Sequence, residues 1–153
     1  MDLQAVKQSL ESTGESLSAS VDSLPGRFFD SFILHGLKID TIEPGRVICS
    51  FKVPQRLVNT GNFLHGGATA SLVDIVGSAA LMAAGALTSG VSVEINISYL
   101  DAAFLGEGVE IEANVLRMGK AIGVVNVDLR KKKTGTLVAQ GRHTKYLAAS
   151  SKL

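Results

Sequence analysis

The chain has 153 residues, of which 46% are hydrophobic, and a formal net charge of +1. This length suits one globular domain with enough apolar material for a core, and the near-neutral charge leaves no electrostatic footprint for nucleic acid. The single cysteine, Cys49, excludes an intramolecular disulfide, and no signal-peptide pattern opens the sequence, so we expect an intracellular protein.

The first part of the chain predicts helices. Residues 1–22 are serine-rich and weakly amphipathic, which favours a short helix or a frayed arm. Residues 23–34 place four apolar side chains on one helical face and so predict core packing for Phe28, Phe29, Phe32 and Ile33.

Two strands are expected next, at residues 37–42 and 46–53. The turn signal Glu43-Pro44-Gly45 joins them, because proline and glycine each favour one of the turn's backbone conformations. Cys49 lies in the second of these strands, and we interpret it as a small strand residue rather than a nucleophile.

The stretch from Asn59 to Asp74 carries the strongest chemical signal. His65-Gly66-Gly67 opens a helix of small residues, and Asp74 is its one acid among apolar neighbours. A carboxylate buried there would need partners or a shifted pKa. The free N–H groups at the start of the helix are suited to hold negative charge, such as an oxyanion.

A membrane span is not expected in the uncharged run 75–93. Three glycines and the break Thr88-Ser89-Gly90 interrupt it, which fits a helix, a turn and a strand better than about 20 continuous apolar residues.

Four further strand-like runs follow the helix and predict an antiparallel meander, at residues 91–99, 109–118, 121–130 and 137–147. In the first run Val91, Val93 and Ile95 alternate with polar residues, so one face should be apolar and the other polar. Together with the long Ala- and Gly-rich helix, this order predicts an α+β fold with an antiparallel sheet of about six strands wrapped around one long central helix.

This arrangement resembles the hotdog-fold acyl-CoA thioesterases, in particular the group called acyl-CoA thioesterase 13 or thioesterase superfamily member 2. The resemblance rests on Asn59, the His65-Gly66-Gly67 turn, Asp74 and the strand from Gly90 to Tyr99, and it spans roughly residues 34–147. The ordered set is specific, whereas His-Gly-Gly alone would be weak.

The resemblance implies hydrolysis of fatty acyl-CoA, of medium to long chain length, to free acid and CoA. No cofactor is expected, and no metal site is indicated, because the three histidines and the one cysteine lie far apart in the sequence. Asp74 would act as general base or nucleophile, and Ser92 would help to hold the water. The side chain of Asn59 and the Gly66 N–H would polarise the thioester carbonyl, and His65 would orient the turn.

Substrate contacts are implied at two further places. Tyr99 and Phe104 would line the channel for pantetheine and the acyl chain. Arg117, Gly119 and Lys120 would meet the phosphates of CoA, with glycine allowing close backbone approach.

The spacing of Gly66 and Asp74 predicts a shared site. Eight helical residues correspond to about 12 Å along the axis, too far for both groups of one helix to reach one carbonyl. Two antiparallel helices from two copies could bring them together. The resemblance likewise implies a homodimer with composite sites, commonly paired into a homotetramer.

Other readings remain open. The protein could be a non-catalytic acyl-CoA-binding hotdog dimer, an aromatic acyl-CoA thioesterase, or a hydratase or dehydratase acting on acyl thioesters. No Ser-His-Asp triad is indicated, and His143 is interpreted as a packed or surface histidine.

The expected organisation is an N-terminal arm at 1–22, a hotdog domain at 23–147 and a tail at 148–153. The tail ends in Ser151-Lys152-Leu153, which at a free C-terminus is the address read by the peroxisomal import receptor. We therefore expect a peroxisomal enzyme of lipid metabolism, with the cytoplasm as the alternative.

Overall fold

The computed structural model describes residues 2–15, 19–26 and 28–148. The chain divides into two compact units, residues 1–32 and residues 33–153. In the first unit, α1 spans Leu3–Glu15 and a 3-10 helix, η1, spans Ala19–Ser23. No residue of α1 is buried. The helix expected in this region is therefore present, without a core of its own.

The short helix α2, Phe28–Leu34, differs from expectation in what it buries. Only Ile33 is buried, whereas the three phenylalanines are exposed. Phe28 and Phe32 instead contact each other, with ring centroids 5.9 Å apart. The prediction of a core position is confirmed for Ile33 and is wrong for the aromatic residues, because rings one turn apart on a short helix can pack on each other.

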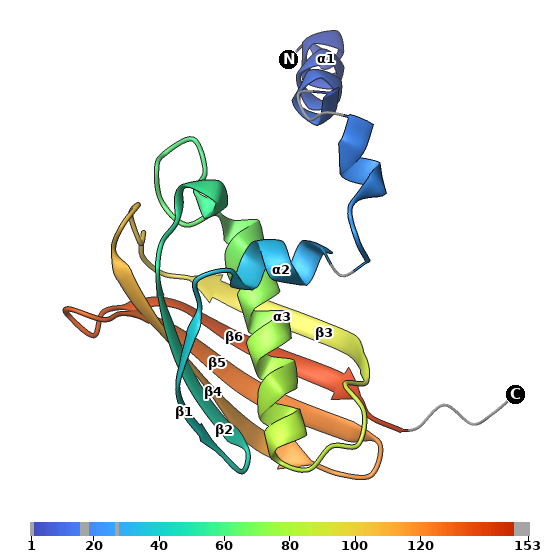
Figure 1. Ribbon diagram of the computed structural model, residues 1–153, viewed down its shortest axis with the longest axis vertical. Coiled ribbons are helices and arrows are strands. Elements are labelled where there is room, and N and C mark those ends of the chain that lie inside the picture. The colour runs from blue at the N-terminus through green and yellow to red at the C-terminus, as the bar shows by residue number, and fades with distance from the viewer. Residues whose placement is uncertain (1, 16–18, 27, 149–153) are drawn as a thin grey trace, which may run out of the picture. The chain divides into compact units, whose positions relative to one another are not determined.

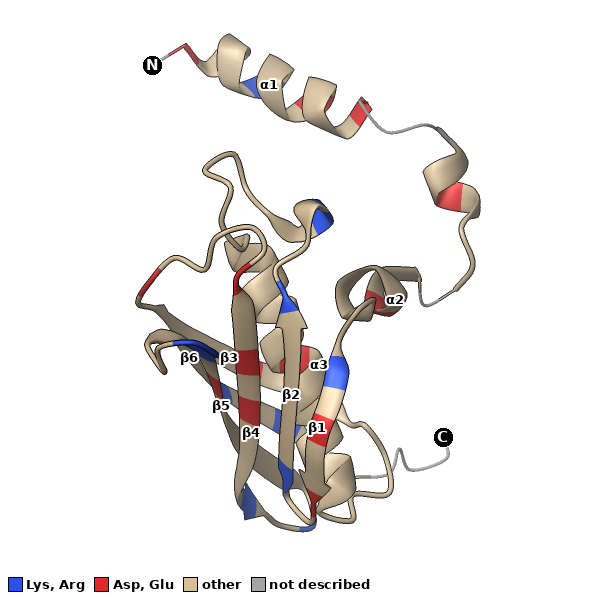
Figure 2. Cartoon of the chain, turned by 60° about the vertical axis from the view of Figure 1, so that its left-hand side comes forward, with Lys and Arg blue, Asp and Glu red and all other residues tan. Residues whose placement is uncertain are grey.

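The second unit holds a six-stranded antiparallel sheet (Figure 1). Its strands are β1 (Lys38–Glu43), β2 (Arg46–Lys52), β3 (Val91–Tyr99), β4 (Gly108–Met118), β5 (Ile122–Lys131) and β6 (Leu137–Tyr146). All six predicted strands are confirmed within a residue or so at each end. A short 3-10 helix, η2 (Gln55–Leu57), follows β2. Basic and acidic residues are interspersed along the strands (Figure 2).

The order of the strands corrects one expectation. The sheet runs β1-β2-β4-β5-β6-β3, so only β4, β5 and β6 form a meander with consecutive pairing. β3 does not pair with β4, its successor in the chain, because β4 lies between β2 and β5 and has no free edge. β3 pairs with β6 instead. β3 therefore forms one edge of the sheet.

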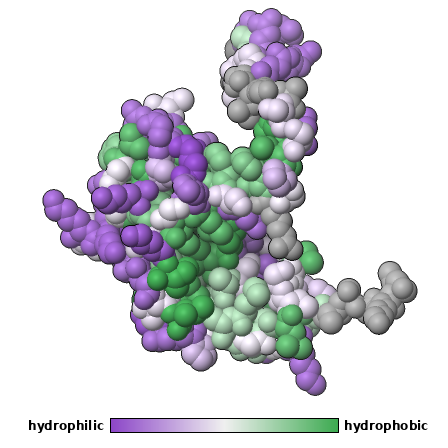
Figure 3. Space-filling view, in the orientation of Figure 1, coloured by the Kyte–Doolittle hydropathy of each residue, from purple (hydrophilic) through white to green (hydrophobic). Residues whose placement is uncertain are grey.

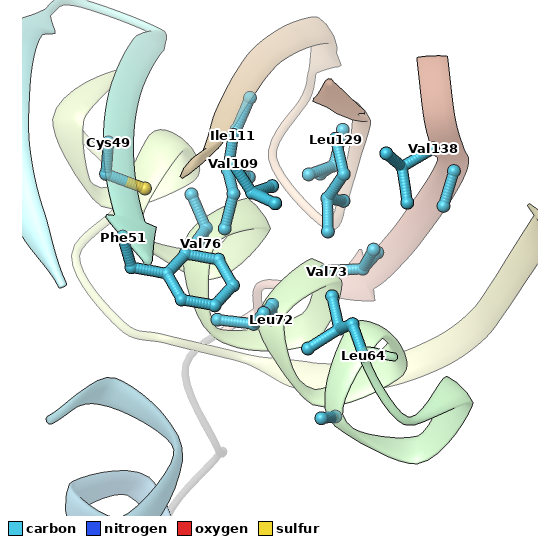
Figure 4. Packing of buried hydrophobic residues seen from close by; sticks show 14 of the residues in the cluster. Cys49, Phe51, Leu64, Leu72, Val73, Val76, Val109, Ile111, Leu129 and Val138 are labelled. Carbon is cyan, nitrogen blue, oxygen red and sulfur yellow. The ribbon is translucent and has the colours of Figure 1, made fainter. Parts of the chain in front are cut away.

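The long helix α3, Gly66–Ala83, lies across one face of the sheet, which confirms the predicted architecture (Figure 1). Leu72, Val73 and Val76 point toward the buried residues of the strands (Figure 4). At Gly141 of β6, a Cβ atom would stand 2.8 Å from Val73 Cγ1, so glycine is what allows the helix to lie this close.

By length and composition, α3 could span a membrane, with a mean hydropathy of 1.4, but 44% of it is buried inside the structure. Packing against the sheet explains its apolar character, as in the core helix of a globular protein.

Cys49 lies fully buried in β2. Burial raises the pKa of its thiol to about 12, and the nearby carboxylates of Asp40 and Glu110 add to this. A thiol that stays protonated is a poor nucleophile, which confirms its interpretation as a small strand residue.

A β-bulge at Val93 changes the faces of β3. Ser92 pairs with Lys145, whereas Glu94 pairs with Thr144, the very next residue back along β6. One extra residue therefore stands between Ser92 and Glu94, and strict alternation fails there. The bulge puts Ser92 on the same face as Ile95, the face that α3 covers, rather than with Glu94.

Candidate active site

The centre of the site is a cluster of three polar side chains from three elements. Ser92 Oγ of β3 lies 3.2 Å from Asp74 Oδ1 of α3 and 2.8 Å from His143 Nε2 of β6. His143 Nε2 also lies 3.5 Å from Asp74 Oδ1. Two of these residues, Asp74 and Ser92, were predicted together, and the structure brings them into contact.

His143 is completely buried, beneath α3. Burial lowers the pKa of its ring, although the charge of Asp74 opposes this effect. Its second ring nitrogen, Nδ1, is buried and has no hydrogen-bond partner among the described residues. A Cβ at Gly77 would stand 3.0 Å from Nδ1, so glycine makes room for the imidazole under the helix.

A buried lysine lies on the other side of Asp74. Lys145 is only 5% exposed, and its Nζ donates to Ser78 Oγ over 2.6 Å, while Ser78 Oγ donates to the Asp74 carbonyl over 2.7 Å. Burial lowers the pKa of Lys145, and the charge of Asp74 partly offsets this. The lysine thus holds the backbone of α3 at the position of the acid.

The surroundings of Asp74 correct the expectation of a buried acid. Its side chain is 46% exposed, because it lies at the margin of the face that α3 buries. In the single chain, one carboxylate oxygen is engaged by Ser92 and the side chain is open to solvent. A carboxylate in this position can take a proton from a water molecule.

The second part of the site is the N-terminus of α3. His65 is the N-cap, and its Nδ1 accepts from the Gly67 N–H over 2.8 Å. The Gly66 N–H belongs to the first helical residue, and no protein acceptor for it is found in the described parts of the chain. The turn therefore offers a donor at the positive end of a helix.

Asn59 lies in the loop that leads to this turn. Its Oδ1 accepts from the N–H of Gly61 over 2.9 Å, which fixes the side chain in an Asx-type turn. The amide nitrogen, Nδ2, has no acceptor in the portion of the structure that is described. The side chain can therefore donate to a carbonyl, as the sequence suggested.

Tyr99 ties the end of β3 to the helix N-terminus, because its hydroxyl donates to the Gly66 carbonyl over 2.9 Å. Beside it is a cavity of about 430 Å³, whose lining includes Phe63, Leu64, Gly66 and Tyr99. The Phe104 ring packs edge-on against Phe63, with centroids 5.9 Å apart. The two predicted channel residues thus lie at or beside a mainly apolar cavity, whose lining also includes Thr69 and Asp101.

The predicted phosphate contacts lie elsewhere. Gly119 and Lys120 line a cavity of about 230 Å³ together with residues 85–88, just beyond the C-terminal end of α3. Arg117 is exposed near the end of β4. One chain does not bring these residues together with either Gly66 or Asp74.

Sequence reasoning missed His143 and Lys145. A usable signal existed, because Ala139, Gly141, His143 and Lys145 alternate along β6 and share the buried face of that strand. Two basic side chains on a core face, in line with a glycine, indicate a polar partner on the covering helix.

Comparisons with known proteins agree with this architecture. A sequence model described as the thioesterase superfamily matches residues 61–138. The chain is 45% identical over 115 residues to human acyl-coenzyme A thioesterase 13, covering 75% of this chain and 82% of that protein. Its structure resembles the crystal structure of zebrafish thioesterase superfamily member 2, with a TM-score of 0.77, 40% identity and coverage of 84% and 92%. The mouse protein of that name gives a TM-score of 0.74, 41% identity and coverage of 80% and 90%.

Proposed function

The chain belongs to the thioesterase superfamily, and we propose that it hydrolyses fatty acyl-CoA thioesters, of medium to long chain length, to the free acid and CoA. It is an acyl-CoA thioesterase by its likeness to acyl-coenzyme A thioesterase 13. The observation that carries the chemistry is the contact of Ser92 with Asp74 Oδ1, which leaves the second carboxylate oxygen open.

In this reaction Asp74 acts as general base. A water molecule gives one proton to Asp74 while its oxygen attacks the thioester carbon. The C–S bond then breaks, and the CoA thiolate recovers the proton from Asp74. Ser92 holds the water in line, which is consistent with its place beside the acid.

The developing oxyanion is held at the start of α3. The Gly66 N–H and the Asn59 side-chain amide donate to the thioester oxygen, and the positive end of the helix adds to their effect. His65 contributes by capping Gly67, which leaves the Gly66 N–H as the exposed donor. The apolar cavity beside Tyr99 has the size and lining to take part of an acyl chain or of pantetheine.

The site is composite, made by two copies of the chain. Both Gly66 and Asp74 lie on α3, about 12 Å apart along its axis. β3 is an edge strand with exposed apolar side chains, Val91 at 68% and Val93 at 63%, and such an edge favours pairing with another strand. Antiparallel pairing of two β3 strands would run the two α3 helices past each other in opposite directions and cover Asp74.

We further propose that two such dimers pair. Ile39 and Ile42 of β1 and Met82 of α3 are more than half exposed, and hydrophobic residues gather on the face that carries α3 (Figure 3).

Arg117, Gly119 and Lys120 supply the phosphate contacts of CoA in the assembled enzyme, since the cavity near Lys120 combines a basic side chain with an accessible backbone.

The peroxisomal address Ser151-Lys152-Leu153 lies outside the described residues. Import into the peroxisome, and binding of the import receptor to this tripeptide, remain proposals that rest on the sequence alone.

The proposed function is tested by thiol release from short, medium, long-chain and aromatic acyl-CoAs. Wild type should release CoA with a preference for fatty chains, and Asp74→Asn should lower kcat by about a hundredfold or more, since general-base catalysis typically contributes 10²–10⁴. Asp40→Asn, which changes an exposed acid of β1, is the control and should match wild type. Size-exclusion chromatography checks that the oligomer is kept.

Other outcomes select the alternatives. Tight binding of intact acyl-CoA without thiol release would indicate a binding protein, and a preference for aromatic substrates would indicate an aromatic acyl-CoA thioesterase. In a covalent route Asp74 would attack the thioester, expel the CoA thiolate and form a mixed anhydride; attack of labelled water on the aspartyl carbonyl of this anhydride would put oxygen-18 into Asp74 during a single turnover.

A further inference from the structure

The Ser92 hydroxyl has one proton and two neighbours that could take it. Its Oγ lies 2.8 Å from His143 Nε2 and 3.2 Å from Asp74 Oδ1. A carboxylate only accepts, whereas an imidazole nitrogen donates or accepts according to its tautomer. The direction of the two hydrogen bonds therefore depends on where His143 carries its proton.

The other ring nitrogen decides the tautomer. If Nδ1 carried the proton, a buried N–H would have no acceptor among the described residues, beneath Gly77. An unprotonated Nδ1 without a hydrogen-bond partner costs less free energy than a buried N–H without an acceptor. The proton then belongs on Nε2, and the doubly protonated ring is disfavoured for the same reason and by its burial.

With the proton on Nε2, both contacts of Ser92 are satisfied. Nε2–H donates to Oγ, and the Ser92 hydroxyl donates to Asp74 Oδ1. With the proton on Nδ1 instead, Asp74 Oδ1 and His143 Nε2 could both only accept, and the single Ser92 proton could satisfy one of them. The other acceptor would then face a lone pair of Ser92 Oγ.

We propose that His143 is a positioning residue for the thioesterase reaction, acting through Ser92. Its Nε2–H donates to Ser92 Oγ, and the Ser92 O–H is thereby directed to Asp74 Oδ1. This holds the carboxylate with Oδ2 free to take the proton of the attacking water. Ser92 keeps one lone pair, with which it can accept from that water. This inference rests on the proposed function for its kinetic consequence and on the geometry alone for its tautomer.

The other charged groups near His143 are Asp74 on α3 and Lys145 on its own strand. Lys145 is engaged by Ser78 Oγ and the ring contacts Ser92 and Asp74, so each basic side chain has its own partner. The imidazole therefore remains neutral while it donates.

Two amide substitutions separate the two ring nitrogens. In His143→Gln the side-chain amide reaches the place of Nε2, whereas in His143→Asn it reaches only the place of Nδ1. We expect His143→Asn to lower kcat by about ten- to a hundredfold with KM changed less than about threefold, because lost orientation acts on the chemical step. His143→Gln should stay within about fivefold of wild type, as it keeps a donor toward Ser92.

A double-mutant cycle tests whether His143 acts through Ser92. Once Ser92→Ala has removed the hydroxyl, adding His143→Asn should change kcat by less than about threefold, since the two residues share one interaction. Independent, multiplied losses would overturn the proposal, and so would a His143→Gln enzyme as slow as His143→Asn.

The tautomer is measured on the wild-type protein, so the proposal does not depend on whether a variant folds. Nitrogen-15 NMR of labelled histidine should show His143 neutral with its proton on Nε2. A proton on Nδ1 would overturn the proposal. If wild type released no thiol from any acyl-CoA, the proposed function would fail while this measurement still decided the direction of the hydrogen bonds.

Discussion

At the scale of single residues, His143 and Lys145 show how a strand face can carry a polar site inside an apolar core. Both side chains are buried, and each has a hydrogen-bond partner on a neighbouring element, Ser92 or Ser78. The pKa of each is lowered, with burial as the main cause. The folded protein therefore binds protons at these groups less readily than the unfolded chain.

This difference predicts how stability depends on pH. Because the His143 pKa is lower in the folded state than its ordinary value of 6.5, the unfolded chain takes up the proton first as the pH falls. The free energy of unfolding should be fully retained above the unfolded pKa and should decrease as the pH drops below it. Urea unfolding at several pH values from 8 to about 5 measures this, as histidine titrates there. His143→Gln should have a flatter profile; equal slopes in both proteins would contradict the account.

At the level of secondary-structure elements, the Gly66 N–H at the start of α3 can be removed by a single substitution to proline. His65 has φ −63° and ψ 136°, an extended conformation that a following proline accepts, and proline is well tolerated at the first helical position. Gly66→Pro should therefore keep the helix while deleting the N–H that we propose holds the oxyanion.

We expect Gly66→Pro to lower kcat by about a hundredfold, the effect typical of losing one oxyanion donor. Gly66→Ala is the matched control, because it adds a Cβ 3.4 Å from the Tyr99 ring and keeps the N–H. Circular dichroism confirms the fold, and thiol release gives kcat. Similar losses in both variants would assign the effect to crowding rather than to the donor.

The strands and helices were predictable from the sequence, whereas an irregularity within one strand was not. The periodicity of the chain predicted all six strands and α3, because alternation and small residues are local signals. It placed Ser92 on the wrong face of β3, since the extra residue at Val93 is visible only in the pairing with β6. The contact of His143 with Ser92 depends on the same bulge and was not predictable, although the alternation along β6 indicated that His143 is buried.

At the scale of the whole molecule, the free edge of β3 and the spacing of Gly66 and Asp74 both indicate a second copy of the chain. The place of β3 at this edge could not be predicted from chain order, because it depends on β4 pairing with β2. The proposed pairing of two copies through β3 would cover both the apolar edge and the half-exposed acid.

A charge on this edge should disrupt the assembly. Val93→Lys is expected to shift the protein toward the monomer and to lower thiol release in parallel, because charged edge strands resist pairing. Leu10→Lys is the control, since Leu10 is 71% exposed and lies in α1, away from the sheet edge in sequence. Light scattering after size exclusion gives the mass. A Val93→Lys protein that is monomeric and fully active would argue against a shared site.

The most direct test of the central claim, that Asp74 of one copy and the Gly66 N–H of another act on one thioester, is subunit complementation. Asp74→Asn and Gly66→Pro are unfolded together in equal amounts, refolded, and assayed for thiol release. Activity should recover to about a quarter of the wild-type value, because random pairing of the two variants gives that share of sites an intact Asp74 and an intact Gly66 N–H. A mixture as inactive as its two components would contradict the account, since it would place both groups of each site within a single chain.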